Sequence, residues 1–409
     1  MAQQKFPEGF YWGAATASYQ VEGGIENCDW AKAAREGKVP VCGAACEHYT
    51  RYEQDFDIAK SLGHNCHRLS VEWARIEPEE GKFDEREIEH YREVLRALRE
   101  RGLEPFITLW HFTLPLWFSE SGGFERKDAP TIFARYCAYV VERLGEQCAH
   151  YATINEPLSF TSNGWRRGTW PPFERWPLIK YAGVSSHTNI LGMRPPARGK
   201  NVLRYFSVLK TLTRAHNAAH DAIKMIAPQA EVGIVHQILF FHANNNPLNQ
   251  FLAWFMNWHW TYSFMDKVVE KCDVIGVNYY LHNKFGDTAV YDKTDMGWDV
   301  YPEGLEEALL MLARYNKPLY VSEAGVADAK DRIRGDYITR LVAAMGRALA
   351  RGADVRGFMY WSLLDNYEWA FGFMKRFGLV EIDYETQKRT IRASAFVYKK
   401  IIEQNGMLE

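Results

Sequence analysis

Eight short apolar segments of strand-like composition recur along the 409 residues of this chain. They read FYWGAATA, NCHRLSV, EPFITLW, YATIN, EVGIVH, DVIGVNYY, PLYVSE and VRGFMYW. Each is followed by a loop and a longer segment with apolar residues at helical spacing, such as Ile88, Tyr91, Leu95 and Leu98 before Gly102. Eight strand-then-helix units predict an α/β fold, a parallel (β/α)8 TIM barrel with its helices outside.

An open, doubly wound sheet is the structural alternative, but no glycine-rich phosphate-binding turn follows the first strand. No linker rich in proline, glycine or serine divides the chain, and no repeat of solenoid length is present. Hydrophobic residues make up 47% of the chain, which is enough to bury a large core. We therefore expect residues 1–409 to form a single barrel domain.

Net charge and cysteine content limit the kinds of partner and the cellular compartment that we expect for this protein. A formal net charge of -2 gives no field of one sign, which argues against nucleic-acid binding. No run approaches the roughly 18 apolar residues of a membrane span, and the opening MAQQKFPEGF has no signal-peptide stretch. Seven cysteines without regular spacing fit reduced thiols. We expect a cytoplasmic protein, and the sequence leaves a homo-oligomer open.

Two short spacings resemble metal ligands but have a simpler interpretation. Cys42, Cys46 and His48 lie close together in CGAACEH, yet no second ligand pair follows at a familiar spacing. His216 and His220 lie four residues apart on a predicted helix, where a packed or solvated face is the commoner arrangement. We expect no metal at either place.

Two further segments lie outside the strand pattern. Residues 193–206, MRPPARGKNVLRYF, are basic and interrupted by prolines, and they predict a surface excursion. Residues 249–265, NQFLAWFMNWHWTYSFM, are dense in aromatic residues. For these we favour a helix buried against the barrel over an apolar wall near a site entrance.

Polar and aromatic residues gather at the predicted strand ends. In a TIM barrel the active site is built at the carboxyl ends of the strands, so these residues converge. They include amides, a guanidinium, an imidazole and carboxylates, which bind hydroxyls, and aromatic rings, which bind the C–H faces of sugars. The residues are Tyr19, Gln20, Arg68, Glu72, Trp73, Trp110, His111, Asn155, Glu156, Asn278, Tyr279, Tyr280, Ser322, Glu323 and Trp361.

Glu156 and Glu323 end the fourth and seventh predicted strands, and Pro157 prevents the fourth from continuing. Cleavage of a glycosidic bond requires such a pair: one protonated carboxyl for the leaving oxygen and one ionised carboxylate for the anomeric carbon. Two close carboxyls push their pKa values apart, which assigns the roles. Arg68 and Tyr280 are placed to hold one of the two ionised.

Longer motifs connect these residues. They are FPEGFYWGAATASYQVEG, HRLSVEWARIEPEEGKFD, ITLWHFTLPLW, TINEP, IGVNYY, YVSEAG and YWSLLDNYEWAFGFMKRFGLVEID. Along nearly its whole length the chain resembles family 1 of the glycoside hydrolases, the β-glucosidase family. The resemblance implies a retaining mechanism on β-linked sugars, a small β-glycoside substrate, and no metal or organic cofactor.

The resemblance also implies individual roles. Glu156 in TINEP resembles the general acid/base and Glu323 in SEAG the nucleophile, while Asn155 matches the residue that holds the sugar 2-hydroxyl. For a retaining enzyme, we expect the two carboxyl groups to lie about 5 to 5.5 Å apart. Further matches are Gln20, His111, Glu368 and Trp369 for the glycone hydroxyls, Trp361 under the ring, Arg68, Asn278 and Tyr280 beside the nucleophile, and Trp298 on the aglycone side.

The chain departs from the family pattern beside the nucleophile. Ser322-Glu323-Ala324-Gly325 stands where the family usually has Thr-Glu-Asn-Gly, so Ala324 removes an amide. Relatives that cleave 6-phosphoglycosides replace the acid of the final motif by a small residue and place Lys and Tyr after it. Here Glu368 is kept, with Lys375 and Phe377 at those two positions, and we expect its charge to disfavour a phosphate.

The sequence leaves the glycone open. Glu368 and Gln20 can bridge the 4-hydroxyl in either epimer, so β-glucosidase, β-galactosidase, β-fucosidase and β-mannosidase preferences are all compatible with it. Transfer to alcohols in place of water is a further alternative. A barrel that binds sugars but has lost catalysis is the hypothesis from another class.

Overall fold

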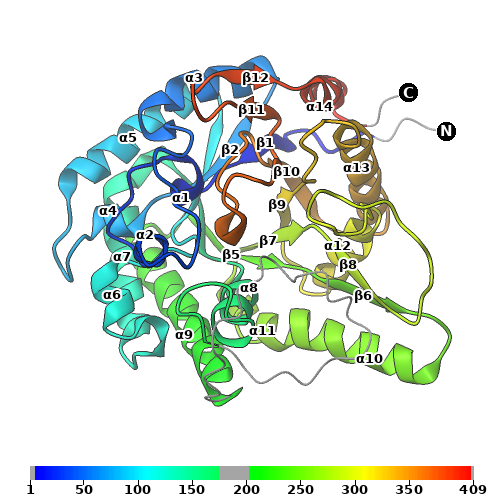
Figure 1. Cartoon of the computed structure of the whole chain (residues 1–409), viewed down its shortest axis with the longest axis horizontal. Coiled ribbons are helices and arrows are strands. Elements are labelled where there is room, and N and C mark those ends of the chain that lie inside the picture. Colours follow the sequence, from blue (N-terminus) through cyan, green and yellow to red (C-terminus); the bar gives the residue numbers. More distant parts are fainter. Residues whose placement is uncertain (1–4, 175–201, 407–409) are drawn as a thin grey trace.

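The computed structural model describes residues 5–174 and 202–406, and a closed barrel of parallel strands occupies its centre (Figure 1). The barrel strands are β1 Tyr11–Ala15, β2 Cys66–Ser70, β3 Glu104–Thr108, β4 His150–Asn155, β5 Glu231–Gln237, β7 Val274–Tyr279, β9 Leu319–Ala324 and β10 Val355–Trp361. Around the barrel they follow the order β1, β10, β9, β7, β5, β4, β3, β2. Each predicted segment overlaps one strand of the barrel, so the (β/α)8 prediction is confirmed.

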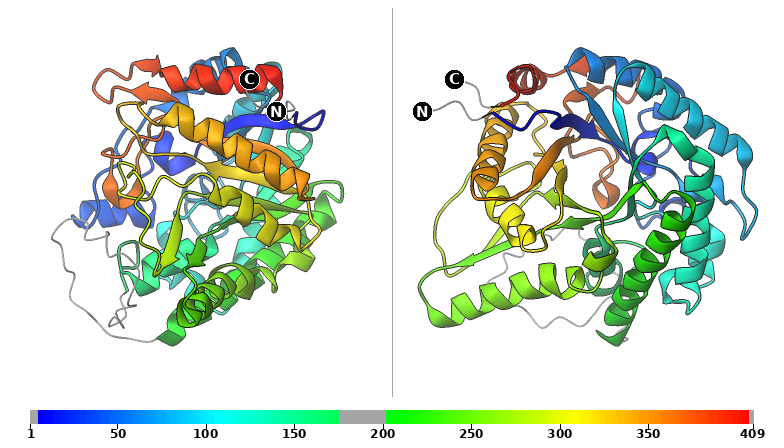
Figure 2. Two further views of the ribbon diagram at one scale, coloured as in Figure 1. Left: turned by 90° about the vertical axis from the view of Figure 1, so that its right-hand side faces the viewer. Right: turned by 180° about the vertical axis from the view of Figure 1, so that it is seen from behind.

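Helices surround the barrel, as both face-on views show (Figures 1 and 2). The longer ones are α3 His48–Ser61, α5 Glu85–Glu100, α7 Ala129–Leu144, α9 Val202–Ile226, α10 Pro247–Asn257, α12 Gly304–Ala313, α13 Arg334–Ala350 and α14 Ala393–Gln404. The shorter ones are α1 Ser18–Val21, α2 Asp29–Arg35, α4 Trp73–Ile76, α6 Leu116–Glu120, α8 Pro157–Thr161 and α11 Ser263–Met265. In the described part of the chain, no helix has the length and apolarity needed to cross a membrane.

Helix α5 shows how local sequence sets these elements. It begins after Asp84, whose carboxylate accepts a hydrogen bond from the Arg86 backbone N–H at 2.9 Å and so caps the helix. Ile88, Leu95 and Leu98 are buried against the barrel, as their spacing predicts. The helix ends before Gly102, whose φ of +68° is the left-handed conformation expected of a residue that follows a helix.

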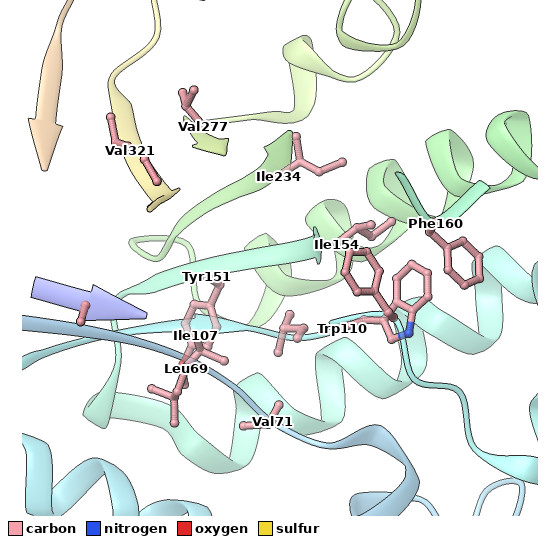
Figure 3. Packing of buried hydrophobic residues seen from close by; sticks show 14 of the residues in the cluster. Leu69, Val71, Ile107, Trp110, Tyr151, Ile154, Phe160, Ile234, Val277 and Val321 are labelled. Carbon is pink, nitrogen blue, oxygen red and sulfur yellow. The ribbon is translucent and has the colours of Figure 1, made fainter. Parts of the chain in front are cut away.

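The core is tightly packed between the strands and the helices. Figure 3 shows Ile234, Val277 and Val321, one from each of β5, β7 and β9. Trp110 and Phe160, which follow β3 and β4, meet edge to face with ring centroids 4.8 Å apart. These contacts fix the helices against the strand ends that carry the candidate site.

Among the described residues, two short β-pairs lie outside the barrel. Strands β6 Phe240–Ala243 and β8 His282–Phe285 form a parallel ribbon packed against α10, and β11 Val380–Ile382 pairs with β12 Arg389–Ile391. Short turns of 3-10 or π geometry include η3 Ser162–Arg166, η4 Trp258–Tyr262 and η6 Trp369–Phe371. The β6–β8 ribbon carries the chain out of the barrel to α10.

Two sequence expectations need correction. The aromatic run was expected to form a buried helix, but only Leu252, Ala253 and Met256 of α10 lie against the protein, and several rings point outward. One helix face cannot bury so many rings, and the inner face is taken by Leu252, Ala253, Met256 and Asn257. Of residues 193–206, those from 202 onward belong to α9 and are helical; the remainder lie outside the described residues.

Candidate active site

Glu156 lies at the turn from β4 into α8. Its backbone has φ +44° and ψ +64°, a left-handed conformation that is unfavourable for a residue with a side chain. The turn is held by a hydrogen bond from its N–H to the carbonyl oxygen of Val235 at 2.9 Å. Pro157 then opens α8 at the position where a missing N–H does no harm. The chain thereby buries the Glu156 carboxyl at the barrel mouth, with 6% of the residue exposed.

Glu323 lies in β9, and both of its carboxylate oxygens have donors. Oε1 accepts a hydrogen bond and an ion pair from Arg68 Nη1, and Oε2 accepts from the Tyr280 hydroxyl at 2.6 Å. Burial, and after it the charge of Glu323, raises the pKa of Tyr280 well above its ordinary value, so the phenol keeps its proton. A buried cation and a buried donor therefore stabilise a negative charge on Glu323.

The Arg68 guanidinium connects the two halves of the site. Its Nε donates to Thr108 Oγ1 at 3.0 Å, and its Nη2 donates to Asn155 Oδ1 at 2.8 Å. Asn155 Nδ2 lies 3.3 Å from His111 Nε2. Burial, followed by the charge of Arg68, lowers the pKa of His111 well below its ordinary value, so its ring is neutral. Thr108 was not among the residues singled out in the sequence.

Glu156 has the opposite environment. Burial, and next the charge of Glu323, raises its pKa to about 8. Asn278 Nδ2 donates to Glu156 Oε1 at 2.7 Å, which opposes that rise. The Glu156 carboxyl therefore carries its proton at neutral pH, while Glu323 is held by a cation.

The side chain of Asn278 bonds to Glu156 and not to Glu323. It faces Glu323 in the register of β7 and β9, and the sequence placed it beside the nucleophile. Its side chain instead donates to Glu156, because Ser322 Oγ donates to Asn278 Oδ1 at 2.8 Å and turns the amide. Strand register alone does not reveal which neighbour an amide selects.

Three buried polar atoms around the pair have no hydrogen-bond partner among the described residues. They are Gln20 Oε1, His111 Nδ1 and Glu368 Oε2. Gln20 is itself fixed, because its Nε2 donates to Asn366 Oδ1 at 3.1 Å and to the Tyr367 carbonyl at 2.8 Å. Buried unpaired acceptors and donors that converge on one place suit a ligand rich in hydroxyls.

The charge expected of Glu368 also needs correction. Burial, then the charges of Glu323 and Glu156, raises the pKa of Glu368 to about 8, so it is mostly protonated at neutral pH. In the free site Glu368 therefore carries little negative charge with which to repel a phosphate. The ammonium of Lys375, at the family's lysine position, donates a hydrogen bond to the Asp295 carbonyl oxygen at 2.5 Å.

Aromatic rings border these polar groups. Trp361 and Trp369 are buried, and each stacks with the His111 ring at a centroid distance of 6.0 and 6.1 Å respectively. Trp298 is half-buried and lies 6.1 Å from the Tyr280 ring. Phe377, at 6.0 Å from Tyr280, completes this wall and was noted in the sequence only for its place in the motif.

Ala324 does not disturb the nucleophile strand. It is fully buried and pairs in register with Tyr279 of β7 and Tyr360 of β10. At Gly325 an added Cβ would lie 1.8 Å from the Trp361 carbonyl oxygen, so only glycine permits this approach to β10. Backbone pairing thus supports the loop where the family has an amide side chain.

The candidate metal ligands have protein partners. Cys42 Sγ and Cys46 Sγ donate to the carbonyl oxygens of Tyr19 and Asp365. His216 lies between Thr153 Oγ1 at 2.7 Å and the Lys271 carbonyl at 3.0 Å. Across residues 5–174 and 202–406, no three His, Cys, Asp or Glu side chains converge on a point where a metal ion could bind.

Comparison with known proteins places this arrangement among enzymes. The model of glycosyl hydrolase family 1 matches residues 2–273 and 259–407. "Beta-glucosidase A" of Thermotoga maritima is 30% identical over 100% of both chains. "Beta-galactosidase" of Sulfolobus acidocaldarius is also 30% identical, over 99% of this chain and 96% of that protein.

Solved structures agree with the sequence matches. A "beta-glycosidase from Pyrococcus horikoshii" superimposes with a TM-score of 0.87 and 34% identity, covering 100% of this chain and 97% of that one. The Thermotoga maritima β-glucosidase in complex with deoxynojirimycin gives a TM-score of 0.87 at 28% identity, covering 99% of this chain and 100% of that one.

Proposed function

The chain belongs to glycosyl hydrolase family 1, and we propose that Glu323 and Glu156 cleave its β-glycoside substrate by double displacement. The family is one of retaining β-glycosidases. A β-glucoside is the proposed substrate, with a β-galactoside as the second candidate, because relatives named β-glucosidase and β-galactosidase align over nearly the whole chain.

In the first step Glu323 attacks the anomeric carbon of the sugar. The bond from that carbon to the leaving oxygen breaks, and Glu156 gives its proton to that oxygen. A covalent glycosyl-enzyme forms, and the charge on Glu323 disappears. Since that charge contributes to the raised pKa of Glu156, its loss favours the ionised Glu156 that the next step needs.

In the second step Glu156 accepts a proton from water, and the water oxygen attacks the anomeric carbon. The bond to Glu323 breaks, and the sugar leaves with its original configuration. Two carboxyl groups and one water balance both steps, so no cofactor enters the proposal. We expect the two carboxyl groups to lie about 5 to 5.5 Å apart.

One observation carries this proposal. The two carboxyls share a buried network through Arg68, Asn155 and Asn278, yet a cation holds Glu323 whereas burial raises the pKa of Glu156 to about 8. Structural carboxylates usually each have a counter-ion, whereas in this pair only Glu323 has one, in Arg68.

Gln20, His111, Asn155, Glu368 and Trp369 are the proposed glycone contacts. Their support is the set of unpaired buried atoms on Gln20, His111 and Glu368, which a sugar's hydroxyls can satisfy. Trp361 is proposed as the surface under the sugar ring and Trp298 as part of the aglycone wall.

Azide rescue tests the roles. Glu323→Gly should lose nearly all hydrolysis of a nitrophenyl β-glucoside and recover turnover with azide, giving an α-glycosyl azide. Glu156→Gly should instead recover turnover with an activated substrate and yield a β-glycosyl azide. If the two variants give the opposite anomers, as NMR of the products would reveal, the two roles have been exchanged.

A panel of nitrophenyl glycosides tests the substrate separately. We expect the highest kcat/KM with the β-glucoside or the β-galactoside, and a lower value with the β-mannoside; the panel also includes the 6-phosphorylated sugars. A preference for the phosphorylated sugars would contradict the proposed substrate class without affecting the roles of Glu156 and Glu323.

We also propose that residues 1–409 form one catalytic domain in the cytoplasm. The two ends of the described chain support the first point: the Tyr398 hydroxyl of α14 donates to the Gly13 carbonyl of β1 at 3.0 Å. The seven cysteines, all free and buried, support a reducing compartment. Cell fractionation tests the location.

A further inference from the structure

Helix α10 turns an apolar face away from the protein. Its exposed fractions are 64% for Leu248, 56% for Phe251, 61% for Trp254 and 39% for Phe255, and Trp258 of η4 is 43% exposed. Leu248, Phe251, Phe255 and Trp258 follow one another at three or four positions, and Trp254 lies three positions after Phe251 and four before Trp258, so they share one side of the helix. Together with Leu203 and Phe206 of α9, which are 69% and 49% exposed, we call them the apolar outer face.

The apolar outer face is continuous across the two helices. The Phe251 ring lies 5.8 Å from Trp254 and 6.5 Å from Phe255, and Phe255 lies 5.9 Å from Trp258. The His259 ring joins the helices, since it lies 6.4 Å from both Phe255 and Phe206. A large aromatic side chain has about 200 Å² of surface, so the face exposes on the order of 700 Å², more than the largest apolar patch of a typical monomer.

The fold itself directs these rings outward. On the inner side of α10, Asn257 Nδ2 donates to the Phe241 carbonyl at 2.7 Å, and Asn257 Oδ1 accepts from the Phe241 N–H at 3.0 Å. Turning the rings inward would break both bonds. In both face-on views α10 lies along the outer edge of the molecule, beyond the β6–β8 ribbon, with no other described element outside it (Figures 1 and 2).

The charges beside the apolar outer face are paired at the start of α9, where Arg204 bonds Glu125 and Glu174, and basic farther along that helix. Between Glu231 and Asp266 the sequence contains no Asp, Glu, Lys or Arg. On α9, Lys210 and Arg214 continue the line of Leu203 and Phe206, and that helix has no acid before Asp221. Both basic side chains are exposed, and neither forms an ion pair with a residue that the structure describes.

Two more basic residues lie close to the ring that joins the helices. Burial, then the charges of Arg166 and Lys267, lowers the pKa of His259, so this ring is neutral and belongs to the apolar surface. The first acid after the charge-free run, Asp266, accepts a hydrogen bond from the Tyr315 hydroxyl at 2.6 Å. An apolar, tryptophan-rich surface with a basic border is therefore presented to the outside.

We propose that the apolar outer face binds the surface of an anionic lipid bilayer. The rings of Phe251, Trp254 and Trp258 lie in the interfacial layer, where tryptophan is favoured, and Lys210 and Arg214 contact the phosphates of the headgroups. The protein then rests on the membrane with α10 parallel to it.

A second copy of the chain is the competing occupant, and the charges disfavour it. A twofold dimer would place the apolar outer face against itself, so Lys210 and Arg214 of both copies would be brought to one interface. Neither α10 nor the exposed start of α9 offers an acid to pair with them. Anionic headgroups supply the missing partner.

Vesicle sedimentation with the full chain tests the proposal. Wild-type protein should sediment with vesicles of equal parts phosphatidylcholine and phosphatidylglycerol, and less with pure phosphatidylcholine. The double variant Phe251→Ser/Trp254→Ser should partition at least tenfold more weakly. Lys210→Glu/Arg214→Glu should lose the preference for the anionic vesicles. Val290→Ser is the matched control, since Val290 is 96% exposed outside this face, and it should bind as wild type does.

Two further measurements keep the result decisive. Hydrolysis of a soluble nitrophenyl β-glucoside should be unchanged in all these variants, which establishes that they fold. Vesicles with bromine-labelled lipid should quench tryptophan fluorescence in the wild type and less in Trp254→Phe. Equal sedimentation of wild type and Phe251→Ser/Trp254→Ser would overturn the proposal. The proposal would also be overturned if light scattering shows that the wild type is a dimer, that this dimer binds neither kind of vesicle, and that Phe251→Ser/Trp254→Ser is a monomer.

Discussion

Asn278 bonds Glu156, and replacing it by leucine removes that contact together with the hydrogen bonds of Asn278 to Ser322 and Asn155. Asn278 Nδ2 donates to Glu156 Oε1 at 2.7 Å, and the bond favours the ionised form of the carboxyl. Leucine has the same branching and is larger, so it removes the donor without leaving room for water. Burial and the charge of Glu323, the two causes that raise the pKa of Glu156, remain.

The size of the effect follows from that bond. A buried hydrogen bond to a charged acceptor contributes about 1.5 to 3 kcal/mol. One pKa unit corresponds to about 1.4 kcal/mol, so the pKa of Glu156 should rise by about one to two units from its value of about 8. Since the proton on Glu156 is the one given to the leaving oxygen, the alkaline limb of kcat/KM should move upward by the same amount.

The assay is a pH profile of kcat/KM with a nitrophenyl β-glucoside. Ser322→Ala is the matched control, because Ser322 donates to Asn278 Oδ1 and its removal leaves the Asn278 N–H groups in place. It should shift the limb less than Asn278→Leu does. If the alkaline limb of Asn278→Leu stays in place or moves to lower pH, Asn278 does not act on the acid/base Glu156. A change confined to the acidic limb would mean that Asn278 acts on the nucleophile Glu323.

Three other outcomes follow from the same contacts. Glu323→Gln removes the charge that is the second cause of the raised pKa of Glu156, so that pKa should fall below about 8, which NMR titration of labelled glutamate can measure. Tyr280→Phe deletes the 2.6 Å bond to Glu323, worth about 1.5 to 3 kcal/mol, and kcat/KM should drop about 10- to 100-fold, whereas Tyr315→Phe on the surface should change nothing. Burial raises the pKa of Asp29 to about 8 in the folded protein, so the folded state binds more protons than the unfolded state between about pH 4 and 8, and stability decreases as pH rises through this range. Asp29→Asn keeps an acceptor for the Leu114 N–H. Between about pH 4 and 8 the free energy of unfolding of this variant, measured by urea titration, should decrease by about 1 to 2 kcal/mol less than that of the wild type. An equal decrease in both proteins would contradict the pKa shift.

The barrel could be predicted because its signal is repeated and local. Each strand is a short apolar run and each helix has its own spacing and ends, as Asp84 and Gly102 show for α5. Parallel strands with intervening helices then permit few arrangements. The position of Glu156 was accessible for the same reason, because Pro157 marks where its strand must stop.

Side-chain pairing could not be predicted in the same way. Asn278 stands opposite Glu323 in strand register, yet it donates to Glu156, and Ser322 decides this by occupying the other end of the amide. The charge on Glu368 was also misjudged, because its pKa depends on burial and on two other acids that come near it only in the folded chain. Such properties depend on distances of a few ångströms between residues far apart in sequence.

The aromatic run of α10 shows a further limit of sequence patterns. Apolar periodicity identifies a helix with two unlike sides, but it gives no direction to the apolar side. Burial against the barrel was the reasonable expectation, because most apolar helix faces are buried. In this helix the inner side holds Leu252, Ala253 and Met256, and the amide of Asn257 orients it, since Asn257 pairs with the Phe241 backbone at the edge of β6. A residue that bonds a strand edge therefore orients the helix more firmly than its apolar residues do, and the rings of Phe251 and Trp254 are left facing outward.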